Sequence, residues 1–288
     1  MPWHGETDLT EEDGVGRERR FGKPRGREIQ AWISCDMTEI VKYPSLLFVV
    51  SFGALGLAVL LGDFFRKRRP MEDGGKEDYG LVESSTLTLL GLLIGFTFSM
   101  ALSRFDQRKN YEEEEANAIG TEYVRADLLL APDAARVREL LKQYLSQRIL
   151  FYTARNARQL RQIDASTAQL QSEMWSIVQA RGTIQTHSVA ALAVSGMNDV
   201  LNSQGYTQAA WWNTIPVAAW TLLMVIAVGS SFLIGYGAHR TSIFVFMILP
   251  LVVSISFFLI ADIDSPRRGM IRVSPINLLS LAQSLTPH

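Results

Sequence analysis

The stretch that decides the fold is Ser84–Ser103, which reads SSTLTLLGLLIGFTFSMALS and contains no Asp, Glu, Lys, Arg or His. A helix needs about 20 such residues to cross the roughly 30 Å hydrocarbon core of a bilayer. Three more stretches of the 288-residue chain meet this requirement. They are Tyr43–Gly62, Val200–Ala238 (apolar from about Thr214) and Thr241–Ala261. The sequence therefore predicts an all-α, polytopic membrane protein with four transmembrane helices.

The distribution of apolar residues also excludes other classes of protein. A hydrophobic content of 48% is ordinary, but unbroken apolar runs are typical neither of a soluble enzyme nor of the alternating strands of an outer-membrane barrel. The net charge of −1, with no basic and aromatic binding module, indicates no nucleic-acid partner. Cys35 is the only cysteine, which excludes an internal disulfide.

Composition divides the chain into successive parts. The N-terminal extension is rich in glycine and charge and lacks an apolar period, so it is predicted to be disordered. An alternative hypothesis is that translation of the natural protein starts at Met37, just before the first span. The predicted parts are the extension at 1–36, a first transmembrane pair at 37–103, a soluble helical domain at 104–213, a second transmembrane pair at 214–261 and a C-terminal tail at 262–288.

The segment between spans two and three shows helical periodicity and no strand pattern. No proline follows span two until Pro132, so that helix is expected to continue to about Leu130. Further helices are predicted over about 133–163, from Ser166 or Thr167 to Gly182, and over 183–203. The acidic run Glu112–Glu115 is interpreted as a solvated face. Spans three and four, separated only by 237–241, are expected to form a tight hairpin, with a kink at Pro250.

Span two contains two lines of residues four apart. Gly91, Gly95 and Ser99 form a small-residue line, which favours close packing of another helix. Leu90, Ile94 and Phe98 form an apolar line beside it, which fits either a pore constriction or an ordinary packed ridge.

Ionisable residues lie only at the edges of the spans, which disfavours a proton-coupled carrier. At the end of span four, Asp262 and Asp264 are followed by Arg267 and Arg268, and we expect an interfacial charge cluster in which the arginines offset the aspartates. No phosphate-binding loop, dinucleotide fingerprint, metalloprotease motif or nucleophile elbow is present. We therefore expect neither an enzyme nor a cofactor.

Two passages together resemble a known family. One is LLGLLIGFTFSMALSR (89–104), followed by EANAIG (115–120), and the other is ADIDSPRRG (261–269), followed by IRVSP (271–275). They are similar to the bacterial bestrophin-like domain membrane proteins, which are named after a similarity to the bestrophins, pentameric anion channels. Asp262 and Asp264 are only a loose analogue of the acidic calcium clasp of animal bestrophins.

The resemblance implies an oligomeric anion channel of the bacterial inner membrane, with span two lining the pore. It places the termini and the helical domain in the cytoplasm. The numbers of Lys and Arg residues beside the spans are nearly equal on the two sides of the membrane, so the positive-inside rule alone does not decide the orientation. The expected partners are lipid, further copies of the chain and small ions. The alternative is a non-conducting scaffold or sensor whose helical domain binds a partner.

Overall fold

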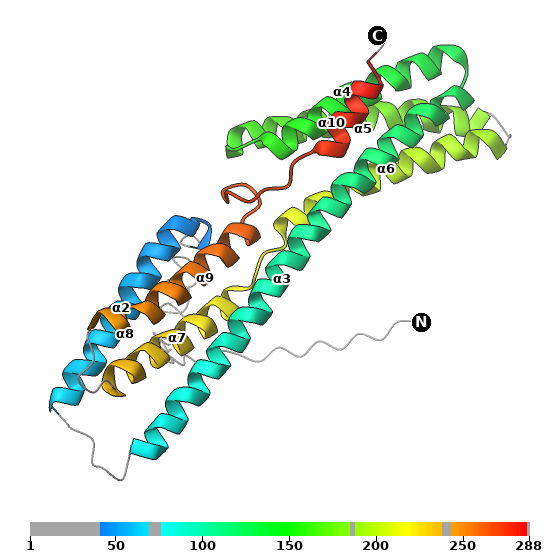
Figure 1. Ribbon diagram of the computed structural model, residues 1–288. Coiled ribbons are helices and arrows are strands. Elements are labelled where there is room, and N and C mark those ends of the chain that lie inside the picture. Colours follow the sequence, from blue (N-terminus) through cyan, green and yellow to red (C-terminus); the bar gives the residue numbers. More distant parts are fainter. Residues whose placement is uncertain (1–40, 69–75, 185–187, 238–242, 287–288) are drawn as a thin grey trace, which may run out of the picture.

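The computed structural model describes residues 41–68, 76–184, 188–237 and 243–286, and every regular element in these ranges is a helix (Figure 1). The all-α class is therefore confirmed for the described part of the chain. The predicted extension at 1–36, the alternative start at Met37 and the turn between spans three and four lie outside these residues.

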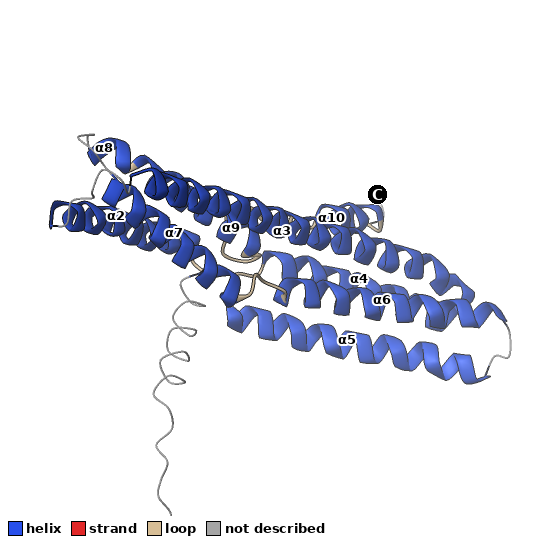
Figure 2. Cartoon of the chain, turned by 90° about the horizontal axis from the view of Figure 1, so that it is seen from below, coloured by secondary structure: helices blue, strands red, loops and turns tan. Residues whose placement is uncertain are grey.

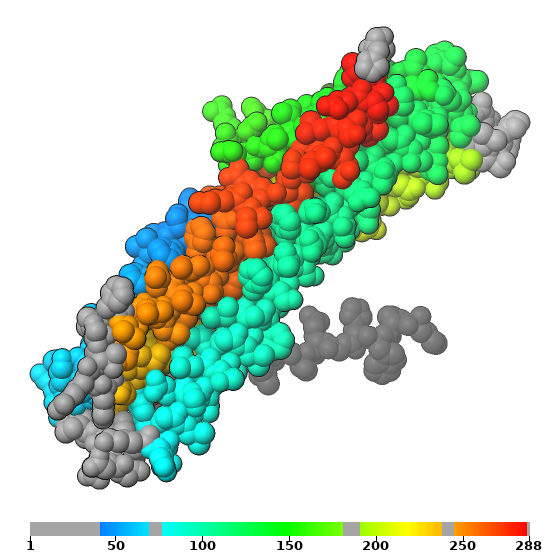
Figure 3. All heavy atoms as spheres, in the orientation of Figure 1, coloured from blue at the N-terminus to red at the C-terminus, as the bar shows by residue number. Residues whose placement is uncertain are grey.

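Helix α3, Lys76–Arg125, runs the length of the molecule and joins two helical bundles (Figures 1 and 3). As predicted, span two continues as one helix well beyond Ser103. With 50 residues it is about 75 Å long, more than twice the thickness of a hydrocarbon core of about 30 Å. Its N-terminal half holds the apolar stretch, and its C-terminal half extends beyond anything a bilayer can cover.

The first bundle consists of the N-terminal half of α3 with α2 (Pro44–Arg68), α7 (Val217–Gly237) and α9 (Ile248–Asp264). Its core contains Leu47 and Leu55 from α2, Leu90 from α3, Trp220 from α7 and Phe257 from α9. Helix α2 packs against both α7 and α9, which make little contact with each other. The expected tight hairpin of spans three and four has its turn outside the described residues, and the two helices pack mainly on α2 rather than on each other.

Helices α2 and α7 cross with their backbones in contact. A Cβ atom on Gly235 would lie 2.0 Å from the carbonyl oxygen of Val59, and one on Gly62 would lie 2.2 Å from that of Phe232. Only glycine allows main chains to approach this closely. Close packing through glycine therefore occurs between α2 and α7, a pair that the sequence analysis did not single out.

Three helical stretches among the described residues are long and apolar enough to cross a membrane: Pro44–Arg68, Glu77–Leu128 and Ala191–Gly237. Helix α9 has 17 residues and follows the short α8, Ile243–Phe246, so the count of four spans stays a prediction. The break between α8 and α9, at Met247, directly follows Phe246, which lies four residues before Pro250. This is where a proline, which lacks an N–H, leaves the carbonyl of Phe246 without a helical partner.

The second bundle is built on the C-terminal half of α3 (Figure 2). It adds η2 (Ala126–Leu128), α4 (Ala131–Thr153), α5 (Ala157–Ile184), α6 (Ser188–Trp212) and α10 (Ile276–Ser284). Of these, α5 packs on α4 and α6, and the others contact α3. Ile119, Tyr144, Met174 and Met197 are fully buried in its core.

Several predicted boundaries were wrong in this bundle. The second predicted helix ends at Thr153, ten residues early, and α5 begins at Ala157 because the Asn156 side chain accepts a hydrogen bond from the Gln159 N–H (2.7 Å). Helix α6 extends past Ser203 to Trp212. The predicted tail contains a helix, α10, which packs on α3 and α4.

Candidate functional site on helix alpha 3 and at the bundle junction

One face of α3 is exposed along almost its whole length. In the most apolar 18-residue segment of α3 only 17% is buried within the chain, whereas 39% of the corresponding segment of α2 is buried. Exposed residues recur every three or four positions, the spacing of a single helix face. We call this face the α3 strip and define it as Ser85, Thr88, Leu92, Phe96, Ser99, Ser103, Asp106, Asn110, Glu113 and Asn117.

The predicted pore line lies away from the centre of this strip. Leu90 is only 2% exposed and belongs to the core of the first bundle, and Ile94 is packed against the same core. Phe98 is 38% exposed, at the edge of the strip. Leu90 is therefore not available to line a path between copies of the chain, because its side chain is enclosed by its own protomer.

Two large apolar side chains lie on the α3 strip within the apolar stretch. Leu92 is 53% exposed and Phe96 is 63% exposed. They are four residues apart, one above the other on the same face. All the other strip residues from Ser85 to Ser103 are serine or threonine.

The small-residue line runs beside this strip, shares Ser99 with it, and contacts no described helix of its own chain. A Cβ atom on Gly91 or on Gly95 would have no other atom within 4 Å, and Ser99 is exposed. The line is therefore open to a further helix from outside the described residues.

Beyond the apolar stretch, α3 sorts its charges by face. Asp106, Glu113 and Glu114 are exposed, whereas Arg108 is buried and Arg104 is mostly covered. Lys109 is the exposed cation of this segment. The strip outside the apolar stretch is therefore predominantly acidic.

Arg108 joins the two bundles at the point where α6, α7, α9 and α3 meet. Its Nε donates to the carbonyl of Ala210, Nη1 to that of Ile263, and Nη2 to those of Asn213 and Asp264, each at 3.2 Å. The side chain is 1% exposed. It thus satisfies carbonyls at the ends of α6 and α9, which have no partner within their own helices.

The four charges at the end of α9 have separate partners, in contrast to the expected cluster. Asp262 accepts hydrogen bonds from the N–H groups of Met270 and Ile271 at 2.7 and 2.8 Å. Asp264 accepts one from the Ile215 N–H at 2.8 Å and forms an ion pair with Arg104 at 3.5 Å.

Arg267 and Arg268 do not offset these aspartates. The Arg268 guanidinium lies over the ring of Tyr43, and Arg267 donates to the carbonyls of Phe151 and Ala154. Among the described residues, neither arginine forms an ion pair with Asp262 or Asp264, because both carboxylates are already held by main-chain N–H groups.

The acidic run on α3 is only half solvated, which corrects its interpretation. Glu113 and Glu114 are exposed, but Glu112 and Glu115 point into the second bundle and are 2% and 0% exposed. Glu112 accepts hydrogen bonds from the Leu278 N–H (3.0 Å) and the Asn277 side chain (2.7 Å), and so fastens α10 to α3. The helical period of the run predicts two inward positions, which the sequence analysis overlooked.

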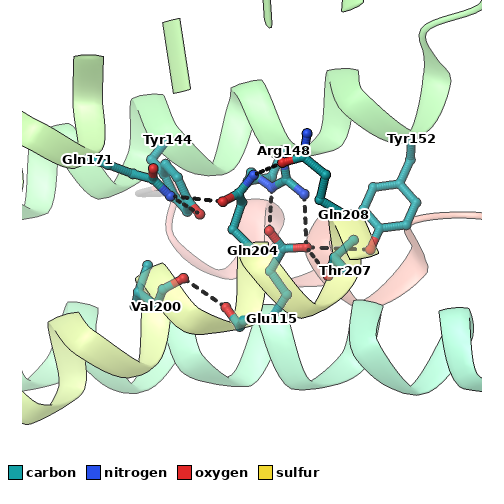
Figure 4. A network of polar contacts seen from close by, with 10 residues as sticks. Glu115, Tyr144, Arg148, Tyr152, Gln171, Val200, Gln204, Thr207 and Gln208 are labelled. Atoms are coloured by element: carbon teal, nitrogen blue, oxygen red, sulfur yellow. Dashed lines mark hydrogen bonds and ion pairs between the residues drawn. The ribbon is translucent and has the colours of Figure 1, made fainter. Parts of the chain in front are cut away.

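Glu115 is the centre of a buried polar network (Figure 4). It forms an ion pair with Arg148 of α4 and accepts hydrogen bonds from the hydroxyls of Thr207 (3.2 Å) and Tyr152 (3.4 Å). Burial raises the pKa values of the Tyr144 and Tyr152 phenols. These groups stay neutral, so the network joins α3, α4 and α6 without a net charge.

Glu122 is a third buried carboxylate on α3, after Glu112 and Glu115, and lies far from the apolar stretch. It is 0% exposed, and neither of its oxygens has a hydrogen-bond partner among the described residues. It fills the space over Gly196, where a Cβ atom would lie 2.0 Å from Oε2. Burial raises its pKa to about 8, although Arg125 acts in the opposite direction. In the described ranges, no group of three or more His, Cys, Asp and Glu side chains is arranged to hold a metal ion.

A family of known sequences matches the part of the chain that contains α3 and both bundles. The model of the bestrophin-like domain matches residues 49–278, most of the chain. The chain belongs to the bestrophin-like family. Within this bestrophin-like protein, the match includes the α3 strip, Arg108 and the Glu115 network. No curated protein matches the chain.

Solved structures show the same fold for this bestrophin-like protein. A variant of a bacterial bestrophin homologue from Klebsiella pneumoniae has 15% identity and a TM-score of 0.59, over 82% of this chain and 97% of its own. A second variant of that homologue has 14% identity and a TM-score of 0.58, over 83% and 93%. A crystal structure of a membrane protein variant has 13% identity and a TM-score of 0.60, over 83% and 97%.

Proposed function

We propose that this protein is a homo-oligomeric ion channel in which the α3 strips of several copies surround the ion path. The observation that supports this function is the composition of the strip. It presents hydroxyl groups within the apolar stretch and carboxylates and amides beyond it, on one continuous helix face. In a membrane helix, a polar face is typical of contact with protein or with water rather than with lipid.

The small-residue line supports assembly through the same region. Gly91 and Gly95 leave open space in a single chain, and small residues allow helices to approach closely in a bilayer. A neighbouring copy would fill this space beside the strip. Gly95→Leu is then expected to reduce the oligomeric size of the purified protein, measured by light scattering, while the protomer stays folded.

The narrowest part of the path is assigned to Leu92 and Phe96. A ring of these side chains, one pair from each copy, would form a short apolar constriction between segments lined by hydroxyl groups. Such constrictions control conduction by excluding water. Ile94, which is partly buried, and Phe98, which is exposed, are the remainder of the predicted pore line and are the alternative.

The charges on the strip decide which ions we expect. The resemblance to bestrophins implies anions, but Asp106 and Glu113 on the strip and the adjacent Glu114 outnumber Lys109, the one exposed cation among described residues 104–117. Rings of carboxylates favour cations at a pore mouth. We therefore propose that this channel prefers cations.

The protein would lie in the bacterial cytoplasmic membrane, with the second bundle and the C-terminus in the cytoplasm. Its partners would be lipid, further copies and the conducted ion.

The test is current through purified protein in planar bilayers with unequal KCl concentrations on the two sides. We expect a reversal potential whose sign shows that K⁺ carries most of the current. A sign showing that Cl⁻ carries it would support a channel but refute the cation preference. No current from an assembled, folded protein would refute the channel and favour the scaffold or sensor.

A further inference from the structure

A basic pocket lies beside the end of α9, where the two bundles meet. Its volume is 230 Å³, and it lies between the α4–α5 turn and the loop from α9 to α10. Three arginines line it, Arg155, Arg267 and Arg272, and no carboxylate does. None of the three forms an ion pair with a described carboxylate.

Arg267 is held in a fixed orientation at this pocket. Its Nη1 donates to the carbonyls of Phe151 (2.9 Å) and Ala154 (3.2 Å). Its guanidinium carbon lies 4.5 Å from the ring centre of Phe151 and 4.4 Å from that of Trp211. Nε and Nη2 donate to no described residue, so part of the guanidinium remains free for a ligand. A preorganised donor loses little entropy when a ligand binds.

The charge of this arginine is incompletely compensated. Burial lowers the pKa of the Arg267 guanidinium to about 10, with Asp164 favouring the charge and Arg148 opposing it. Arg272 is exposed, and its Nε donates to the Gly269 carbonyl at 2.6 Å. An anion in the pocket would offset this excess of positive charge.

The surroundings favour an amphiphilic anion. Next to Arg272, the same loop exposes the apolar side chains of Met270 (81% exposed) and Ile271 (40% exposed). The loop begins directly after the apolar helix α9, at the border of the membrane bundle. Basic pockets at this depth bind anionic headgroups, and guanidinium groups bind phosphate oxygens in pairs.

We propose that Arg155, Arg267 and Arg272 form a binding site for a phosphate-bearing anion at the membrane border. The site does not depend on the channel, because its residues lie off the α3 strip. A phospholipid headgroup and free phosphate share this chemistry, and the experiment distinguishes them.

The experiment measures thermal stabilisation of the full-length protein in a neutral detergent. The protein is titrated with inorganic phosphate, with a short-chain phosphatidylglycerol and with the corresponding phosphatidylcholine. The test variant is Arg155→Gln/Arg272→Gln, which leaves the packed Arg267 intact. The control is Arg158→Gln/Arg161→Gln, which removes the same charge from exposed positions of α5 outside the pocket.

We expect phosphatidylglycerol to stabilise the wild type and the control variant at concentrations at least tenfold lower than those needed to stabilise the test variant. Phosphatidylcholine should change the Tm of all three proteins little. An equal response to inorganic phosphate would identify free phosphate as a sufficient ligand. Stabilisation by phosphatidylglycerol alone would identify a lipid headgroup. Equal binding by the test and control variants, or no response of the wild type to either anion, would overturn the proposal.

Discussion

The guanidinium group of Arg108 and the carbonyl oxygen of Asp264 lie 3.2 Å apart, although 156 residues separate them in the sequence. Arg108 and Glu112 lie one turn apart on α3 but bind different segments. Arg108 binds main-chain carbonyls at the ends of α6 and α9, and Glu112 binds α10. One turn of α3 therefore fastens three distant segments.

Arg108→Gln should destabilise the junction strongly. Each buried carbonyl that loses its hydrogen-bond donor costs about 1–3 kcal/mol, so the free energy of unfolding should fall by roughly 3 kcal/mol or more. The measurement is thermal unfolding in detergent. Lys109→Gln, at the exposed neighbouring position, should leave the Tm nearly unchanged. Equal Tm values for the two variants would contradict the role of Arg108.

Gly235→Ala should destabilise the contact between α2 and α7. The added methyl would lie 2.0 Å from the Val59 carbonyl oxygen, and main chain cannot move aside cheaply. Overpacking of this kind typically costs about 1–3 kcal/mol. Gly229→Ala is the matched control on the same helix, because its Cβ would have no neighbour within 4 Å. A Tm unchanged by Gly235→Ala would show that the helices lie further apart.

Glu122 should make stability depend on pH. Its pKa rises from 4.5 to about 8 on folding, so the folded protein binds a proton that the unfolded chain releases between these values. Stability contributed by this group is therefore present at pH 4.5 and is lost as the pH rises to 8.

Glu122→Gln keeps the neutral form at every pH and should raise the Tm at pH 8 while changing it little at pH 5. The increase should be about 4 °C or more, since 1 kcal/mol shifts the Tm of a protein of this size by roughly 2–4 °C. Glu113→Gln, at an exposed position of α3, is the control. Parallel pH profiles of wild type and Glu122→Gln would refute this assignment, in which Arg125 and Asp199 are the facing charges.

The constriction is tested with two double variants that remove similar apolar volume. Leu92→Ala/Phe96→Ala should increase ion flux into liposomes severalfold, because smaller side chains admit water to the apolar segment. Ile94→Ala/Phe98→Ala should change flux less. A larger effect of Ile94→Ala/Phe98→Ala would instead support the constriction that four-residue spacing predicts, at Ile94 and Phe98. Leu90→Ala should instead lower the Tm, because Leu90 is in the protomer core.

Orientation is tested by fusion to the C-terminus. Alkaline phosphatase is active only outside the cytoplasm, so a fusion after His288 should be inactive, and a green fluorescent protein fusion should fluoresce. An active phosphatase fusion would reverse the proposed topology.

The sequence by itself determined the helical class, the membrane-spanning character and the continuation of span two into a long helix. These properties depend on composition and on local periodicity, which are present in any window of a few turns. The bestrophin-like family followed from two short passages, one in the middle of α3 and one at the end of α9, which meet at the junction. Helix ends were less predictable: Asn156 was a visible capping signal, but α6 passes through Ser203 because its packing on α3 outweighs local preference.

Only the tertiary structure decided which faces of α3 point inward. Four-residue spacing marks two lines of residues equally well, and the periodicity of a uniformly apolar helix does not say which line its neighbours cover. Burial by α2, α7 and α9 placed Leu90 in the core and left Leu92 and Phe96 exposed. The partners of Arg108, Glu112 and Glu115 were likewise undecided, because a buried charge selects its partner from segments brought together by folding.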